Sequence, residues 1–129
     1  MWYATLFADK VKRKHKTIVV DFDGTIAVDL YPDIGNPKPG AKKALEAFSA
    51  AGYEIVIFSC RLTNGGGDQK TRMEKWLKDH EMPFDRIDDG TKGKPHALWY
   101  IDDKAIWYGG KNDWEAISKH ILDGGDLCR

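Results

Sequence analysis

Two aspartates separated by one residue follow directly on a short β-branched run. The run is Thr17-Ile18-Val19-Val20, and the segment after it is Asp21-Phe22-Asp23-Gly24-Thr25. Because side chains alternate along an extended chain, Asp21 and Asp23 project to the same side, and Gly24 lets the backbone leave the strand abruptly. An acidic turn with a helpful glycine is the plain alternative, but this motif directly after a β-branched run is rare by chance.

Clustered carboxylates at this position favour a bound metal ion. Two carboxylates about 4 Å apart repel each other by about 4 kcal/mol at an effective dielectric constant of about 20. Asp102 and Asp103 follow a later predicted strand and add to that repulsion. A hard cation with oxygen ligands relieves it, and magnesium keeps water positions that a phosphate oxygen can take. Asp21, Asp23, Asp102 and Asp103 together therefore predict a Mg²⁺ site.

Strand-like and helix-like segments alternate along the chain. The predicted strands are 17–20, 53–58, 84–87 and 97–101, and the predicted helices are 41–51, 69–80 and 114–122. This order predicts an α/β fold: a three-layer α/β/α, Rossmann-like domain with a parallel sheet and helices on both faces. Three strands end in a polar residue, at Asp21, Ser59 and Asp102. Since ligands of such sheets bind at the carboxyl ends of the strands, these residues indicate a site.

Length and composition describe one soluble globular domain. The 129 residues are 42% hydrophobic and 31% charged, and we expect a lead-in over 1–16 and a single domain over 17–129. Twenty basic and twenty acidic residues cancel, so no global field attracts nucleic acid or a membrane; the basic run 10–16 is the local exception. Cys60 and Cys128 lie too far apart in the sequence to indicate a disulfide framework or a zinc site. No secretory signal or spanning segment is evident, which predicts a cytoplasmic location.

Four ordered elements resemble the haloacid dehalogenase superfamily of phosphohydrolases. They are the DFDGT segment at 21–25, Ser59 after the second strand, Lys94 before the fourth strand, and the pair Asp102-Asp103 after it. The likeness covers nearly all of the chain after residue 16. It implies a magnesium-dependent phosphatase of the compact type without a cap domain, which hydrolyses a phosphate monoester through an aspartyl-phosphate.

The resemblance also implies a role for each matching residue. Asp21 is the expected nucleophile and a metal ligand, and Asp23 is the expected acid and base, with its backbone carbonyl on the metal. Ser59 and Lys94 are expected to bind the transferred phosphoryl group, Lys94 pairing with Asp21 as well. Asp102 and Asp103 are expected to hold the metal directly or through water. The remaining expected substrate contacts are Gly24, Thr25, Cys60 and Arg61.

Several of these positions have a second interpretation. Lys92 and Lys104 are alternatives to Lys94, with solvation as their plainer role. Ser59 can instead bond nearby backbone at the end of its strand. Cys60 is expected to be a small buried side chain rather than a nucleophile, because no histidine is placed to activate it. Arg61 either binds a second anionic group of the substrate or forms a surface ion pair.

The short connections leave no room for a cap domain, either over 26–38 or over 88–93. By resemblance, cap-less members act on macromolecular phosphates or cover an open site by forming oligomers. The loop 29–35 is expected to serve as a small flap. The substrate is a phosphorylated small molecule or a 3′-phosphorylated nucleic-acid end, the latter suggested by Ser59-Cys60-Arg61, Arg72, Trp76 and the basic run. A binding module that kept the fold but lost turnover is the non-enzymatic alternative.

Overall fold

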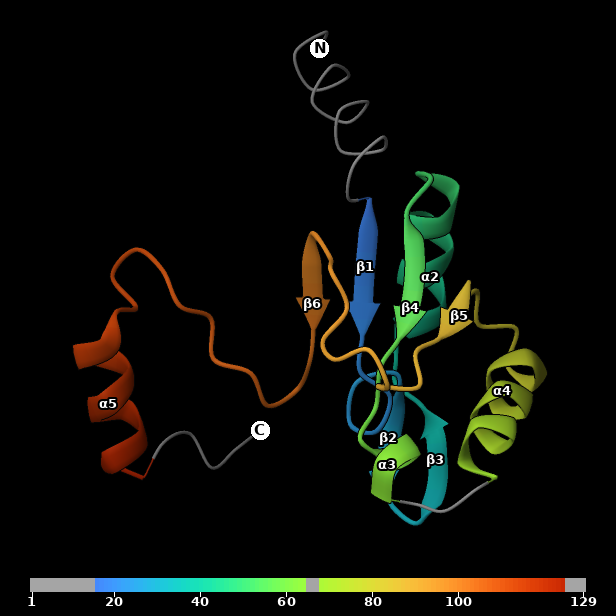
Figure 1. Ribbon diagram of the computed structural model, residues 1–129, viewed down its shortest axis with the longest axis horizontal. Helices are drawn as coiled ribbons and strands as arrows, with labels where there is room; N and C mark the ends of the chain where they lie inside the picture. Colours follow the sequence, from blue (N-terminus) through green and yellow to red (C-terminus); the bar gives the residue numbers. More distant parts are fainter. Residues whose placement is uncertain (1–15, 65–67, 125–129) are drawn as a thin grey trace, which may run out of the picture.

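The structure is a computed structural model and describes residues 16–64 and 68–124 (Figure 1). Its main element is a four-stranded parallel sheet with the strand order β5-β4-β1-β6. The strands are β1 (Thr17–Val20), β4 (Glu54–Ile57), β5 (Arg86–Ile87) and β6 (Trp99–Ile101), each inside the segment predicted for it. The helices are α2 (Ala41–Ala50), α3 (Arg61–Asn64), α4 (Gln69–Asp79) and α5 (Trp114–Leu122). The mixed α/β class with a parallel sheet is therefore confirmed.

One face of the sheet carries the main core. Alternate residues of β1 and β4, such as Ile18 and Ile55, point to this face and pack against apolar residues of α2 and α4. Leu45 comes from α2, and Met73 and Leu77 come from α4; all three are buried. Both helices lie on the same face because the connections β1–α2–β4 and β4–α4–β5 step across the sheet in the same direction.

The strand order reverses beside β1. The chain steps outward from β1 to β4 and β5, then returns across the sheet through residues 88–98 to form β6 on the other side of β1. The carboxyl ends of β1 and β6 therefore flank the point at which ligands of open parallel sheets bind. Asp21 follows β1 and Asp102 follows β6, so the topology brings these two acids to one edge.

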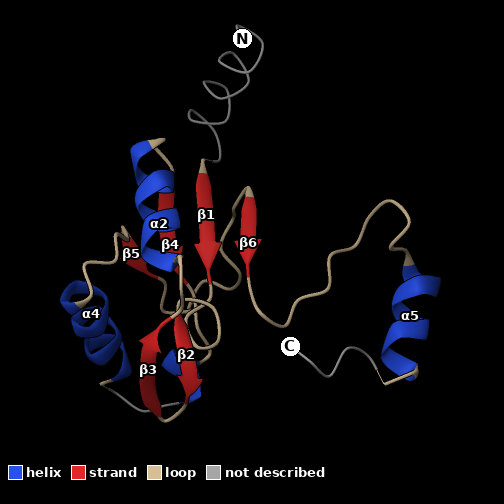
Figure 2. Ribbon diagram, turned by 180° about the vertical axis from the view of Figure 1, so that it is seen from behind, coloured by secondary structure: helices blue, strands red, loops and turns tan. Residues whose placement is uncertain are grey.

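The segment 29–35, which we predicted as a loop that serves as a flap, belongs to a two-stranded hairpin. Its strands are β2 (Ala27–Leu30) and β3 (Asp33–Pro37), which pair in antiparallel fashion below the carboxyl end of β1 (Figures 1 and 2). The base of the hairpin is fixed because Ile26 and Ala27 are buried in the main core. The tip, at Tyr31, is exposed.

α5 lies away from the sheet at the end of an extended connection (Figures 1 and 2). Asp113 caps it by accepting a hydrogen bond from the N–H of Ala116. Ile117 is buried, whereas Trp114 and Leu122 are exposed. The helix forms where the sequence predicts it, but it does not cover the second face of the sheet.

No helix in the described ranges 16–64 and 68–124 has both the length and the apolar character needed to cross a membrane. Most of the basic run, from Lys10 to His15, lies outside the described residues. Lys16 is described: its ammonium donates to the carbonyl of Ala51 and lies over the ring of Tyr53.

Candidate active site

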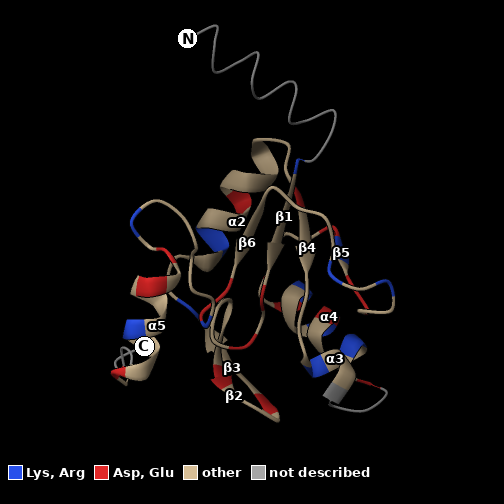
Figure 3. Cartoon of the chain, turned by 60° about the vertical axis from the view of Figure 1, so that its left-hand side comes forward, with Lys and Arg blue, Asp and Glu red and all other residues tan. Residues whose placement is uncertain are grey.

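Three aspartates meet where β1 and β6 end. Asp21, Asp102 and Asp103 each offer a carboxylate oxygen, and these oxygens lie within 4.8 Å of one another. Figure 3 shows the acidic segments at the ends of these strands. Three carboxylates at this spacing are a donor set that suits a hard divalent cation. The predicted cluster thus forms from three of its four members; the carboxylate of Asp23 is engaged elsewhere.

Gly24 allows the backbone to pass beside this cluster. Its φ angle is 84°, in the left-handed region that favours glycine. A Cβ atom at this position would lie 2.4 Å from Oδ2 of Asp103, so any side chain would displace that carboxylate. Thr25, the next residue, donates its hydroxyl to Oδ2 of Asp21 at 3.4 Å. Gly24 and Thr25 therefore shape the acidic cluster from the β1 side.

The carboxylate of Asp21 is hard to ionise when no metal is bound. Its pKa rises from 3.8 to about 6, chiefly because burial removes water from the charged form. The N–H of Phe22 opposes this shift, and the negative charges of Asp102 and Asp103 reinforce it. Such a perturbed acid at the end of a strand is typical of a functional site.

We expect the affinity for Mg²⁺ to depend on pH through Asp21. Below a pH of about 6 the cation must displace a proton from Asp21, so the affinity should fall up to tenfold for each pH unit. Above that pH the affinity should level off. Calorimetric titration with Mg²⁺ between pH 5 and pH 8 measures this dependence. An affinity that does not change across this range would contradict the role of Asp21 as a ligand, and the Asp21→Asn variant, which has no proton to lose there, serves as the control.

A cavity of about 280 Å³ opens beside the cluster. It is lined by five residues that the sequence predicted, Asp21, Asp23, Ser59, Cys60 and Arg61, and by three others, Asp29, Tyr31 and Lys104. Residues from the ends of β1 and β4, from the hairpin and from the segment after β6 thus share one hollow. It is large enough for a phosphoryl group and part of a leaving group, but not for a large ligand.

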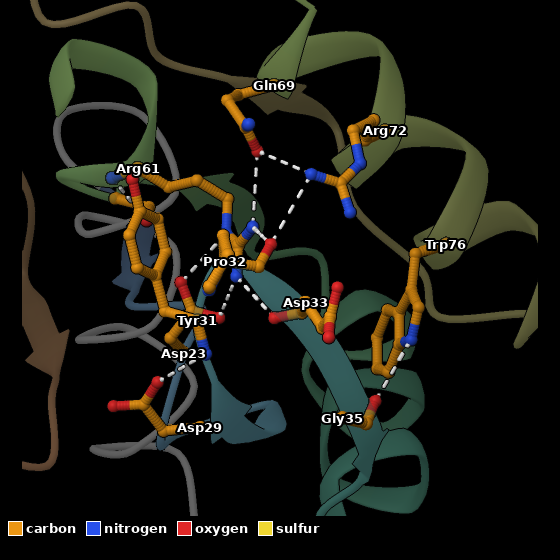
Figure 4. A network of polar contacts seen from close by, with 11 residues as sticks. Asp23, Asp29, Tyr31, Pro32, Asp33, Gly35, Arg61, Gln69, Arg72 and Trp76 are labelled. Carbon is orange, nitrogen blue, oxygen red and sulfur yellow. Dashed lines mark hydrogen bonds and ion pairs between the residues drawn. The ribbon is translucent and has the colours of Figure 1, made fainter. Parts of the chain in front are cut away.

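Asp23 forms a buried ion pair with Arg61 (Figure 4). Nε of Arg61 donates to Oδ2 of Asp23 at 2.9 Å, and Nη2 donates to Oδ1 at 2.7 Å. The side chain of Arg61 is fully buried, whereas 15% of the Asp23 side chain is exposed. The expected surface ion pair of Arg61 is therefore wrong. A second expectation, that Asp23 joins the other acids, is also corrected, because this bidentate contact draws its carboxylate toward α3.

Ser59 bonds nearby backbone, as its second interpretation expected, and its side chain also faces the site. It is buried, lines the cavity, and accepts a hydrogen bond from the N–H of Arg61 at 3.1 Å. The acceptor role leaves its hydroxyl proton to be donated, and no partner for that proton is described within 16–64 and 68–124. The expected burial of Cys60 is wrong: Cys60 is exposed, because Ser59 and Arg61 on either side of it turn inward at the start of α3.

Lys94 is not placed at the acidic cluster. Its ammonium lies 4.6 Å from the ring centroid of Tyr100, and in the described part of the chain it forms no ion pair with Asp21. The hydroxyl of Tyr100 donates to the carbonyl of Pro95, which holds the segment of Lys94 against β6. The predicted contact between Lys94 and Asp21 is corrected accordingly.

Lys104 is the lysine that the structure places beside the acids. Its ammonium lies 3.6 Å from Oδ2 of Asp103, and it lines the cavity with Asp21. The charge of Asp103 raises the pKa of Lys104, with smaller contributions from Asp29 and Asp21. The position of Lys104 directly after the acidic pair was the sequence signal that could have identified it.

Comparison with known proteins supports the fold alone. No protein-family model and no curated protein matches the chain. A solved structure of a conserved protein from Bacteroides thetaiotaomicron is 24% identical, covers 86% of this chain and 93% of its own, and superposes with a TM-score of 0.56. A solved structure from Vibrio cholerae is 29% identical over 70% of this chain and 81% of its own, with a TM-score of 0.48. The chain therefore shares a mixed α/β fold with the Bacteroides protein.

Proposed function

We propose that this chain is a magnesium-dependent phosphatase of the haloacid dehalogenase type, without a cap domain. The observation that carries the proposal is the position of Asp21. It lies at the reversal of strand order, beside Asp102 and Asp103, and it faces a cavity of a size that suits a phosphoryl group. Phosphoryl transfer requires such positioning and neutralisation of spreading negative charge.

Hydrolysis proceeds in two steps. An oxygen of Asp21 attacks phosphorus and the ester P–O bond breaks. Asp23 enters this step protonated on one oxygen, while Arg61 holds the other oxygen, and it gives that proton to the leaving oxygen. The alcohol departs and an aspartyl-phosphate remains on Asp21. Asp23, now a carboxylate, takes a proton from a water molecule whose oxygen attacks phosphorus. The bond between phosphorus and Asp21 breaks, which releases inorganic phosphate and restores both aspartates.

Asp21, Asp102 and Asp103 would hold the metal, whose positive charge stabilises the negative phosphoryl oxygens when it is bound. Among the chain's own residues, Ser59 supplies a hydroxyl donor that lines the cavity. Lys104 takes over the cationic role expected of Lys94, because it is the lysine beside Asp103. Thr25 orients Asp21 through its hydroxyl.

A phosphorylated small molecule is the substrate class that we favour. Three of the residues that suggested a nucleic-acid end have partners within the protein: Arg61 pairs with Asp23, Arg72 donates to the carbonyl of Pro32, and the indole N–H of Trp76 donates to the carbonyl of Gly35. The 3′-phosphatase interpretation therefore depends on Ser59, Cys60 and the basic run at 10–16, and a binding module without turnover stays the non-enzymatic alternative.

Phosphate release from a substrate panel tests the proposal. The panel contains p-nitrophenyl phosphate, nucleotides, sugar phosphates and a 3′-phosphorylated oligonucleotide, each assayed with Mg²⁺ and with a chelator. We expect release that requires Mg²⁺ and is faster for a small ester than for the oligonucleotide. Bound Mg²⁺ without turnover on any member would favour the binding module instead. Oligonucleotide as the best substrate would favour the 3′-phosphatase.

A further inference from the structure

We propose that Arg61 is a positioning residue that fixes the carboxylate of Asp23 and ties it to the β2–β3 hairpin. The inference deepens the proposed function and rests on it, since Asp23 acts there as the proton donor. It differs from the role expected from the sequence, in which Arg61 binds the substrate directly. Figure 4 shows the partners of the Arg61 guanidinium, from which we infer this role.

Every N–H of Arg61 is engaged within the protein. A guanidinium has five N–H groups in a fixed planar fork. Nε and Nη2 hold the two oxygens of Asp23, while Nη2 also donates to the carbonyl of Asp33 at 2.9 Å. Nη1 donates to the carbonyl of Pro32 at 2.8 Å and to Oε1 of Gln69 at 3.1 Å. Because the side chain is fully buried and its donors are used, it has no N–H left for a substrate anion.

The same guanidinium connects Asp23, the proposed proton donor, to the β2–β3 hairpin, whose tip lines the cavity. Asp23 follows β1, whereas Pro32 lies in the turn of the hairpin and Asp33 begins β3. The ring of Tyr31, at the hairpin tip, lies with its centroid 4.8 Å from the guanidinium carbon and also lines the cavity. A shift of the tip must therefore break or bend hydrogen bonds of the group that holds Asp23.

Two residues of α4 also bind Arg61 and the turn of the hairpin. Oε1 of Gln69 accepts from Nη1 of both Arg61 and Arg72, and Arg72 donates to the carbonyl of Pro32 at 3.3 Å. The turn of the hairpin is thus held by two arginines, of which only Arg61 reaches Asp23. A leaving group that rests against Tyr31 would act on the proton donor through Arg61. This arrangement couples recognition of the leaving group to its protonation without a cap domain.

A leaving-group comparison separates positioning from general stability. Nitrophenolate departs without a proton, whereas an alkoxide requires one. In Arg61→Lys, which keeps the charge but loses the fork, we expect kcat on an alkyl phosphate to fall at least tenfold more than kcat on p-nitrophenyl phosphate. Arg86→Lys is the matched control, because Arg86 also pairs with an aspartate, Asp88, but on the surface. Equal losses on the two esters would overturn the inference and leave the proposed function standing.

The Asp23→Asn background makes the comparison more specific. Once the proton donor is absent, adding Arg61→Lys should produce no further difference between the two esters. A persistent difference in the double variant would show that Arg61 acts without Asp23 and would overturn the inference. If the unaltered chain releases phosphate from neither ester, the proposed function fails and this inference fails with it.

Hydrogen exchange tests the tie to the hairpin without any assay of activity. Amides of residues 27–37 should exchange faster in Arg61→Lys than in the unaltered chain or in Arg86→Lys. Unchanged exchange rates in Arg61→Lys would show that Arg61 does not hold the hairpin, and would overturn that part of the inference. If Arg61→Lys does not fold, Gln69→Met removes one partner of the guanidinium and leaves Asp23 in place. We expect from it a smaller leaving-group effect of the same sign, and no effect would again overturn the inference.

Discussion

Replacing Asp21 with asparagine is expected to reduce phosphate release about a thousandfold or more. The amide oxygen is a poor nucleophile and carries no charge for the metal, so both roles of the residue are lost together. Steady-state release with saturating Mg²⁺ measures the effect. Asp79→Asn is the matched control, since Asp79 is an exposed aspartate at the end of α4 that forms a surface ion pair with Lys75. Phosphate release that survives in Asp21→Asn would show that another residue is the nucleophile.

The same substitution should stabilise the metal-free protein at neutral pH. The folded-state pKa of Asp21, about 6, lies above its ordinary value of 3.8. The stability that this group contributes is therefore present at low pH and is lost as the pH rises through about 6. Because Asp21 is partly exposed and water screens its charge, the gain from Asn at pH 7.5 should be about 1 kcal/mol. Thermal unfolding with a chelator measures it, and a lower Tm for Asp21→Asn would contradict the raised pKa of Asp21.

Replacing Arg61 with methionine is expected to cost about 3–5 kcal/mol of unfolding free energy. Methionine fills a similar volume, but the substitution removes both hydrogen bonds from Arg61 to the carboxylate of Asp23 and its hydrogen bond to the carbonyl of Asp33. The carbonyl of Pro32 keeps only its longer bond to Arg72. Removing one member of a buried pair is more costly than removing both. The double variant Arg61→Met, Asp23→Leu should accordingly recover part of the loss.

Urea unfolding without metal measures these differences. Arg86→Met is the control and should cost less than about 1 kcal/mol, because the Arg86–Asp88 pair lies on the surface. A cost for Arg61→Met as small as that of the control would show that the Arg61 network contributes little. If the double variant recovers no unfolding free energy, the unpaired carboxylate of Asp23 is not the cause of the loss in Arg61→Met.

Local sequence patterns were enough to predict the sheet and the position of its acidic edge. The β-branched run at 17–20 and the apolar run at 55–58 form most of two adjacent central strands. Asp21 and Ser59, which come directly after these runs, line the cavity. Alternating strands and helices dictate parallel pairing, and parallel pairing brings the strand ends together. The meeting of Asp21 with Asp102 and Asp103 follows from that logic.

The partners of Asp23 and Lys94 could not be predicted in the same way. Arg61 is buried only because the hairpin folds over it and offers two carbonyls, and neither contact has a signature in the sequence. The side chains of Lys94 and Lys104 are equally long and charged, so their spacing does not decide which one reaches the acids. The contact between Tyr100 and Pro95 decides it by holding the segment of Lys94 against β6.

The hairpin itself was missed because its strands are short and mostly exposed. Val28, Asp29 and Leu30 are all exposed, so the alternation of buried and exposed residues that marks a strand is absent from β2. The strands form because Ile26 and Ala27 anchor one end in the core and Arg61 holds the turn. Tertiary contacts, rather than local preference, therefore determine this part of the site.

Trapping the covalent intermediate tests whether Asp21 is the nucleophile. The protein is mixed with p-nitrophenyl phosphate and Mg²⁺, quenched with borohydride, and digested for mass spectrometry, so that an aspartyl-phosphate is reduced to homoserine. We expect homoserine at position 21, dependent on both substrate and Mg²⁺. Turnover with the modification at another residue, or with no modification at all, would contradict it.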